Sequence, residues 1–234
     1  MNNEIESIRD RYERRKRINE IDLYNPLNPA VYLNLQEKER ALINWIHSSK
    51  LTPIENKRIL EIGCGYGGNL LQFIKLGFKP ENIVGNELLE ERAQFARSRL
   101  PKSTNIIVGD ASSLQLKYGS FDIVFQSTVF TSILDTDFQK KLADRMWDLV
   151  KPGGGVLWYD FIYDNPKNPD VKGVPVSQIS ELFPRGKLTV WHITLAPPIA
   201  RRVTKIHPCL YSILNIIPLF RTHVLCWIEK ENRV

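Results

Sequence analysis

The sequence is poor in cysteine and has no hydrophobic run long enough to cross a bilayer. Its three cysteines, Cys64, Cys209 and Cys226, form no C-x-x-C pair and follow no secretory signal. A disulfide framework or zinc site is therefore not expected, and reduced thiols favour a cytoplasmic location. The apolar stretch 210–220 is too short to span a membrane and contains Pro218. An H-E-x-x-H motif and a compact histidine–carboxylate cluster are also absent, so we expect no metal.

Acidic residues are outnumbered by basic ones. The 234 residues carry 32 lysines and arginines against 26 aspartates and glutamates, for a net charge of +6. Much of the excess lies in residues 9–17 and at Arg201, Arg202 and Lys205. The simplest interpretation is a solvated helix face, and the alternative is an anionic acceptor or peripheral contact with a membrane.

Strand and helix patterns alternate through most of the chain. Short apolar runs predict strands at 59–62, 83–87, 105–108, 121–125, 154–159, 188–195 and 223–229, most of them separated by helical stripes. This alternation predicts an α/β fold, a doubly wound and mostly parallel sheet covered on both faces. Residues 1–52 are expected to form a helical cap, whose second helix has Asn34 as its N-cap and Leu35, Leu42, Ile43 and Ile46 on one face. The main domain then spans 53–234.

A glycine-rich turn follows the first strand. Glu61 ends an apolar run, and Gly63, Gly65 and Gly67 precede the next helix. Glycines let a bound molecule approach the backbone, and a helix N-terminus offers free N–H groups. Together with Gly68, the turn also satisfies the dinucleotide pattern G-x-G-x-x-G, so a nicotinamide cofactor is one option.

The order of motifs between about residues 57 and 159 resembles the class I S-adenosylmethionine-dependent methyltransferases. Glu61 leads into G-x-G-x-G, Glu87 ends the second strand, Gly109-Asp110-Ala111 follows the third, and Lys151-Pro152-Gly153-Gly154 leads into the fifth. A dehydrogenase explains the first two features and not the last two. The resemblance implies a seven-stranded Rossmann-like sheet in which the last strand is antiparallel and lies between the fifth and sixth.

The resemblance also implies S-adenosyl-L-methionine as cofactor and a role for each motif. Gly63, Gly65 and Gly67 would receive the methionine portion, with Glu61 near its ammonium group and Gln126 beside it. Glu87 would accept from the ribose hydroxyls and Leu88 would pack on adenine. Asp110 would accept from the adenine amino group, and the Ala111 N–H would reach a ring nitrogen.

The acceptor site is less constrained by the sequence. Asp160 follows the fifth strand and is our first candidate for a catalytic base, with His192 as the second, although a core histidine is an alternative for His192. Tyr163, Arg201 and Arg202 are candidate acceptor ligands, and the insert 196–222 is expected to form a lid. We expect a small-molecule or glycan-like acceptor, methylated at oxygen, in polysaccharide or natural-product biosynthesis.

Two other functions remain open at this point. An NAD(P)-dependent oxidoreductase would share the glycine turn and Glu87, and a non-catalytic partner protein could retain the cofactor site. A nucleic-acid methyltransferase is disfavoured because Gln126-Ser127-Thr128-Val129 stands where an N/D-P-P-Y/F motif would lie. The sequence does not determine the oligomeric state.

Overall fold

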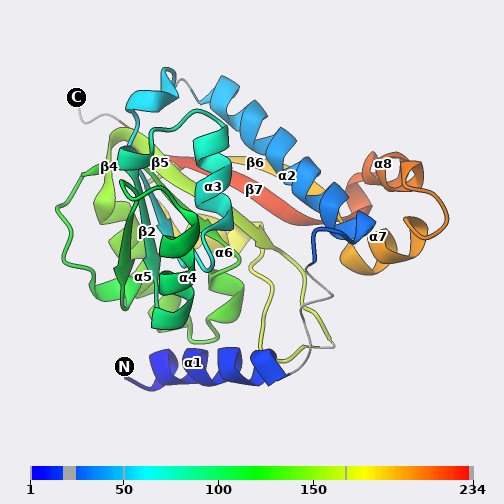
Figure 1. The fold of residues 1–234 in the computed structure, drawn as a ribbon, viewed down its shortest axis with the longest axis horizontal. Coiled ribbons are helices and arrows are strands. Elements are labelled where there is room, and N and C mark those ends of the chain that lie inside the picture. Colours follow the sequence, from blue (N-terminus) through cyan, green and yellow to red (C-terminus); the bar gives the residue numbers. More distant parts are fainter. Residues whose placement is uncertain (1, 18–24, 50, 167, 232–234) are drawn as a thin grey trace.

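The protein forms one seven-stranded sheet between two layers of helices in a computed structural model (Figure 1). Residues 2–17, 25–49, 51–166 and 168–231 are described. The strands are β1 (Ile59–Ile62), β2 (Ile83–Glu87), β3 (Asn105–Val108), β4 (Phe121–Ser127), β5 (Val150–Phe161), β6 (Lys187–Leu195) and β7 (Arg221–Glu229). Their order is β3-β2-β1-β4-β5-β7-β6, and β7 pairs antiparallel with both neighbours. The expected fold and the placement of the last strand are confirmed.

Helices cover both faces because side chains alternate along each strand. The helices are α1 (Asn2–Arg17), α2 (Pro29–Ser48), α3 (Gly68–Lys75), α4 (Glu90–Arg99), α5 (Thr136–Leu149), α6 (Val176–Leu182), α7 (Pro197–Val203) and α8 (Cys209–Asn215). One core packs α2, α3 and α4 on the sheet, and the other packs α1, α5 and α6 on the opposite face. In β5, for example, Leu157 faces the first core and Trp158 faces the second.

The second helix begins earlier than the sequence pattern suggests. Asn28, and not Asn34, is its N-cap: the Asn28 side chain accepts from the Ala30 N–H, and Pro29 opens the first turn. The buried face is partly as expected: Leu42 and Ile46 are buried, but Leu35 and Ile43 are exposed, while Lys38 and Trp45 are buried. The early start lengthens α2 to 20 residues and turns Lys38 toward the sheet.

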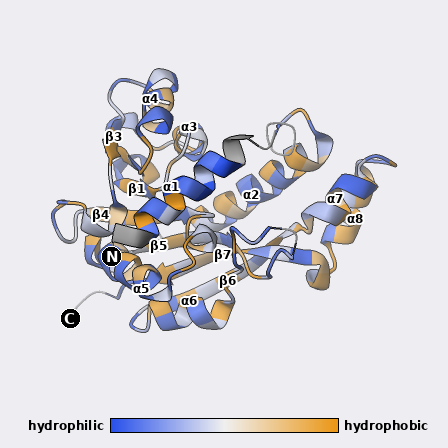
Figure 2. Ribbon diagram, turned by 90° about the horizontal axis from the view of Figure 1, so that it is seen from below, coloured by the Kyte–Doolittle hydropathy of each residue, from blue (hydrophilic) through white to orange (hydrophobic). Residues whose placement is uncertain are grey.

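The N-terminal helix α1 packs on loops that follow two of the parallel strands. The Arg11 guanidinium donates to the Ser132 carbonyl, and the Leu134 N–H donates to the Glu4 carboxylate. Both partners lie after β4, and Arg92, after β2, stacks over Tyr12. Figure 2 looks onto this helix. The α1 helix therefore covers part of the carboxyl edge of the sheet, where ligands bind in open α/β folds. The boundary expected at residue 52 stays a prediction.

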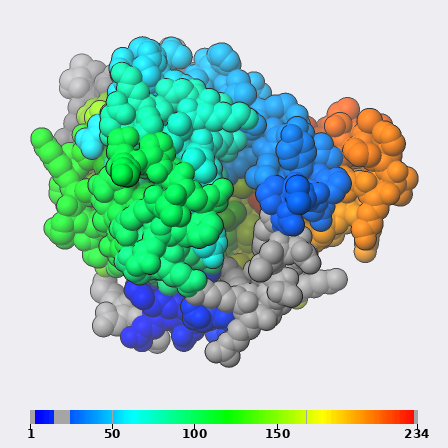
Figure 3. Space-filling model, in the orientation of Figure 1, coloured from blue at the N-terminus to red at the C-terminus, as the bar shows by residue number. Residues whose placement is uncertain are grey.

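A small helical unit projects from the other end of the molecule. Residues 196–220, which we call the knob, contain α7, α8 and the short 3₁₀ turn Pro218–Phe220. They join β6 to β7 and extend sideways from the body (Figures 1 and 3). The knob packs on β6 and the start of α2 through Ala30, Leu195, Ala200 and Tyr211. No helix among the described residues is long and apolar enough to cross a membrane.

Candidate active site

The strand that leads into the glycine turn carries a buried carboxylate oxygen without a partner. Glu61 is fully buried, and its Oε1 accepts from the Asn69 amide at 2.6 Å while Oε2 has no partner. A side chain on Gly65 would meet nothing within 4 Å, whereas one on Gly63 would collide with Val129 at 2.6 Å. One on Gly67 would press on Leu100 at 3.1 Å. Gly65 therefore provides room for a ligand, while Gly63 and Gly67 are required for packing.

Glu87 ends β2 and fixes the shape of the turn. Its two carboxylate oxygens accept from the backbone N–H groups of Gly65 at 2.8 Å and Leu89 at 2.9 Å. These bonds hold the carboxylate against the open side of Gly65. A carboxylate has about four acceptor positions, so two remain for a ligand that carries hydroxyl groups.

Asp110 caps the turn that follows β3. Its oxygens accept from the Ser112 N–H and hydroxyl, both at 2.8 Å. A hollow of about 330 Å³ borders Asp110 and runs along residues 107–116. A side chain on Gly109 would also meet nothing within 4 Å. Asp110 therefore has a structural role and still faces space that a flat ring could fill.

The candidate adenine residues share a cluster with the N-terminal helix. Leu88 and Ala111 are half-buried against the same core as Ile5, Ile8 and Tyr12 of α1. The apolar face of α1 thus forms a wall at this end of the site. The sequence predicted a helical cap over residues 1–52 but not these contacts, because they join residues far apart in the chain.

These features fit S-adenosylmethionine. The buried, unpartnered oxygen of Glu61 suits an ammonium group, the open Gly65 suits close approach to the backbone, and Glu87 and Asp110 accept hydrogen bonds from hydroxyl and amino groups. The three carboxylates come from the ends of three adjacent strands. Among the described residues, no group of three histidine, cysteine, aspartate or glutamate side chains is arranged to bind a metal.

A buried lysine joins α2 to this end of the sheet. The Lys38 ammonium donates to the Asn69 side-chain oxygen at 2.8 Å and to the Ser127 hydroxyl at 3.0 Å, and it lies 4.4 Å from the Tyr159 ring centre. Burial lowers the pKa of Lys38, against the attraction of Glu61 and Asp160. Burial also raises the pKa of Glu61. The sequence analysis missed Lys38, although Ala41, Leu42 and Trp45 at its i+3, i+4 and i+7 positions marked its face as apolar.

Asp160 and Gln126 are buried and form hydrogen bonds with neighbouring protein groups. The Asp160 carboxylate accepts from the Thr131 hydroxyl at 2.7 Å and the Phe161 N–H at 3.1 Å, and burial raises its pKa to about 7. The Gln126 side-chain oxygen accepts from the Val129 N–H at 3.0 Å. Asp160 lies within β5 and not beyond it. Both side chains therefore support the turn after β4, and the roles expected for Asp160 as a base and Gln126 beside the methionine portion stay predictions.

Aromatic and polar side chains meet where β5, β6 and β7 approach the knob. The Tyr159 and His223 rings stack at 5.3 Å, and the Tyr159 hydroxyl lies 3.2 Å from that of Thr194. Burial, followed by the charge of Lys38, lowers the pKa of His223 to about 4, so its ring is neutral at pH 7. Thr194 has φ 65°, a strained backbone conformation for a β-branched residue and one typical of functional sites. We did not single out this cluster from the sequence because it joins three strands.

The other predicted acceptor residues lie apart from this cluster. His192 is exposed on the edge strand β6, so it is not a core histidine. Tyr163 is exposed in the loop after β5. Arg201 and Arg202 lie in the last turn of α7, within the knob. Their roles toward an acceptor stay predictions.

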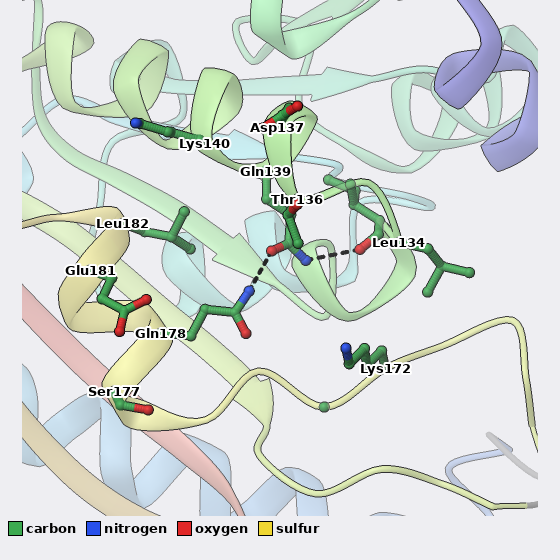
Figure 4. Close-up of a pocket in the computed structure, with 12 residues that line it drawn as sticks. Leu134, Thr136, Asp137, Gln139, Lys140, Lys172, Ser177, Gln178, Glu181 and Leu182 are labelled. Atoms are coloured by element: carbon green, nitrogen blue, oxygen red, sulfur yellow. Dashed lines mark hydrogen bonds between the residues drawn. The ribbon is translucent and has the colours of Figure 1, made fainter.

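A larger surface depression, of about 450 Å³, lies elsewhere between α5 and α6 (Figure 4). Gln178 donates to Gln139, which in turn donates to the Phe130 and Ile133 carbonyls. Its lining includes none of the three strand-end carboxylates, and these amides satisfy one another. We assign it no role in the chemistry.

Comparison with known proteins agrees with the site. The family described as "Methyltransferase domain" matches residues 59–154. The chain is 28% identical over 127 residues to the sterol 4-C-methyltransferase strm-1 of Caenorhabditis elegans, covering 53% of this chain and 37% of that protein. It is 31% identical over 138 residues to a fatty-acid O-methyltransferase of Mycolicibacterium smegmatis, covering 57% and 49%. The chain thus spans half or less of the length of these relatives.

A solved structure extends the similarity beyond the matched segment. A possible histamine N-methyltransferase of Thermotoga maritima superimposes with a TM-score of 0.60 at 19% identity, over 92% of this chain and 96% of that one. At this identity the likeness concerns the fold alone.

The strand order and the three strand-end carboxylates define a class I methyltransferase fold. The chain is similar to the class I S-adenosylmethionine-dependent methyltransferases in sequence over residues 59–154 and in fold, and this similarity supports S-adenosyl-L-methionine as its cofactor. The resemblance recognised in the sequence is confirmed.

Proposed function

We propose that this protein transfers the methyl group of S-adenosylmethionine to a small-molecule acceptor. The observation that carries the proposal is the unpaired, buried Glu61 oxygen, taken together with the open face of Gly65 in the turn that follows it. Glu87 and Asp110 continue the same edge of the sheet. A nicotinamide dinucleotide has no primary ammonium group to meet Glu61.

In the proposed reaction the sulfonium supplies an electrophilic methyl group. Glu61 would hold the ammonium end, Glu87 would accept from the ribose hydroxyls, and Asp110 would accept from the adenine amino group. The acceptor must approach in line with the methyl–sulfur bond, from the side opposite the sulfur. We place its entry beside Lys38, Tyr159 and His223, beyond the methionine end. The neutral His223 ring is a further candidate to accept or orient an acceptor proton.

The acceptor we favour has an apolar body and is methylated at oxygen. Tyr159 and Phe161 both pack on His223 at the proposed entry and supply apolar surface. Two relatives carry the names of sterol and fatty-acid methyltransferases, although a tRNA N(3)-cytidine methyltransferase also matches. A glycan-like acceptor, a polysaccharide or natural-product pathway and a cytoplasmic location remain hypotheses from the sequence.

The test has two steps. Calorimetry should show that S-adenosylhomocysteine binds at micromolar or lower concentration, on the order of −8 kcal/mol, while NAD does not bind. Labelled methyl transfer to fatty acids, sterols and oligosaccharides should then identify an acceptor, with Glu87→Ala as the inactive control. Binding of NAD without S-adenosylhomocysteine would overturn the proposal. Cofactor binding without transfer to any acceptor would instead indicate a non-catalytic partner protein.

A further inference from the structure

The knob carries positive charge and no negative charge. Residues 196–220 contain Arg201, Arg202 and Lys205 and no aspartate or glutamate, and Arg221 follows at the start of β7. Within the knob, Arg202 and Lys205 are exposed, and Arg201 is half-exposed. A local field of one sign is the feature that anionic surfaces recognise.

The same unit exposes aliphatic side chains. Of the fourteen large hydrophobic residues that are exposed in the described part of the chain, five lie in the 25-residue knob. They are 42% to 78% exposed: Ile206, Ile213, Ile216, Ile217 and Leu219. A cluster of this kind on a soluble surface marks an interaction site.

These side chains are not needed to fold the knob. Its interior is formed by other residues, with Ala200 and Tyr211 buried against Ala30 and Leu195. The Tyr211 hydroxyl donates to the Asn34 side chain at 2.8 Å, and Arg221 donates to the carbonyls of Asn215 and His192. The knob is therefore anchored from its inner side while its aliphatic residues face solvent.

We propose that the knob docks on an anionic lipid bilayer. Aliphatic side chains at this density insert at the headgroup–acyl boundary, and each nearby lysine or arginine strengthens binding to anionic lipid about fivefold. A second copy of the chain fits less well, because two knobs of the same charge repel one another. If the proposed function holds, docking would bring a lipid acceptor to the side of the sheet where β5, β6 and β7 meet the knob.

The knob carries a reporter for this test. Cys209 opens α8 and is exposed, whereas Cys64 and Cys226 are buried. An environment-sensitive dye on Cys209 should shift to the blue when vesicles of phosphatidylcholine with about one-third phosphatidylglycerol are added. Pure phosphatidylcholine should cause little shift. The same dye on a Cys209→Ser, Tyr118→Cys variant should not respond, because Tyr118 lies on a distant loop.

Cosedimentation with the same vesicles separates the contribution of the aliphatic side chains from that of the basic side chains. The triple variant Ile213→Ser, Ile216→Ser, Leu219→Ser should bind at least about tenfold more weakly, and Arg202→Gln, Lys205→Gln should lose its preference for anionic vesicles. The matched control Ile43→Ser, Phe95→Ser, Tyr118→Ser removes three exposed apolar side chains outside the knob and should bind as the wild type does.

Three results would overturn the proposal. The first is that the control triple variant weakens vesicle binding as much as the knob triple variant does. The second is that the wild type binds to neither kind of vesicle. The third is that the wild type forms a dimer in sedimentation velocity and the knob triple variant does not. The dimer would identify a second copy as the partner. Because vesicle binding needs neither cofactor nor acceptor, its failure is distinguishable from failure of the methyltransferase proposal, which S-adenosylhomocysteine binding and methyl transfer test separately.

Discussion

Buried ionisable side chains gather at the carboxyl edge of the sheet, and each is held by a different set of partners. Lys38, Glu61 and Asp160 are all less than a tenth exposed. Burial favours the neutral form of each group, so their pKa values move toward neutrality: those of the acids upward and that of the lysine downward. Such shifts are typical of functional sites and leave a measurable mark on stability.

The pH dependence of stability should report the titration of the Asp160 carboxyl group. Its pKa rises from 3.8 to about 7 on folding, mainly through burial, so between these values the native protein binds more protons than the unfolded chain. The stabilisation is complete below about pH 4 and is lost as the pH rises through about 7. In urea unfolding, the unfolding free energy of Asp160→Asn should decrease less steeply with rising pH than that of the wild type, by up to about 1 kcal/mol per pH unit. Asp144→Asn, at an exposed carboxyl, is the control, and parallel curves for wild type and Asp160→Asn would contradict the expectation.

Glu87 should matter for both the turn and the cofactor. Glu87→Ala leaves the Gly65 and Leu89 amides without an acceptor, which we expect to lower the unfolding free energy by about 2 kcal/mol. Loss of two ribose hydrogen bonds should weaken S-adenosylhomocysteine binding by about 2–4 kcal/mol in calorimetry. Glu90→Ala, three residues along the chain at an exposed position, should change neither quantity. An unchanged dissociation constant in Glu87→Ala would show that Glu87 does not meet the ribose.

At the scale of elements, the start of α2 determines which of its residues reach the sheet. The Asn28 cap and Pro29 open the helix, and Lys38 and Trp45 then face the core. The pair Asn34–Tyr211 connects the same helix to the knob. One element therefore contacts both the cofactor end and the projecting end of the molecule.

The cap should contribute to global stability without altering the site. Asn28→Ala removes the acceptor of the Ala30 N–H and should lower the unfolding free energy by about 1 kcal/mol in urea denaturation. Asn28→Ser keeps a capping oxygen and should retain most of it. S-adenosylhomocysteine affinity should stay within about twofold in both variants, because later turns of α2 remain packed. Equal stability of the alanine and serine variants would argue that the cap is not significant here.

At the scale of the whole molecule, the proposed cofactor site and the knob lie at opposite parts of one sheet. The carboxylates proposed to bind the cofactor lie in β1 and β2 and just after β3, and three strands, β4, β5 and β7, separate β1 from β6. At about 4.8 Å per strand this is about 19 Å, roughly twice the Debye length in 0.1 M salt. Charge on the knob should therefore have little influence on cofactor binding.

The double variant Arg201→Glu, Arg202→Glu tests that separation. We expect S-adenosylhomocysteine affinity within about twofold of wild type, and a raised KM for an anionic acceptor with kcat unchanged. Calorimetry and steady-state kinetics measure the two effects. A collapse of cofactor affinity with unchanged acceptor kinetics would mean that the knob closes on the cofactor.

The local sequence was sufficient to predict the strands and the polar residues at their ends. Hydrophobic runs located all seven strands within a few residues, and Glu61, Glu87 and Asp110 stood out because polar side chains interrupt or end those runs. The glycine turn was recognisable because few other residues adopt its backbone. Strand order followed from the family resemblance and not from the patterns themselves.

Tertiary packing alone decided which side chains became buried partners. Lys38 is buried because α2 lies over Asn69 and Ser127, and Asp160 is committed because the turn after β4 brings Thr131 to it. Tyr159 and His223 meet only because β7 inserts beside β5. The periodicity of a sequence predicts which face of a helix or strand is buried, but not which side chains of other elements it meets. Each of these contacts joins residues at least 29 apart in the chain. Their burial and pKa values therefore follow from the sheet order and from the helices packed on it.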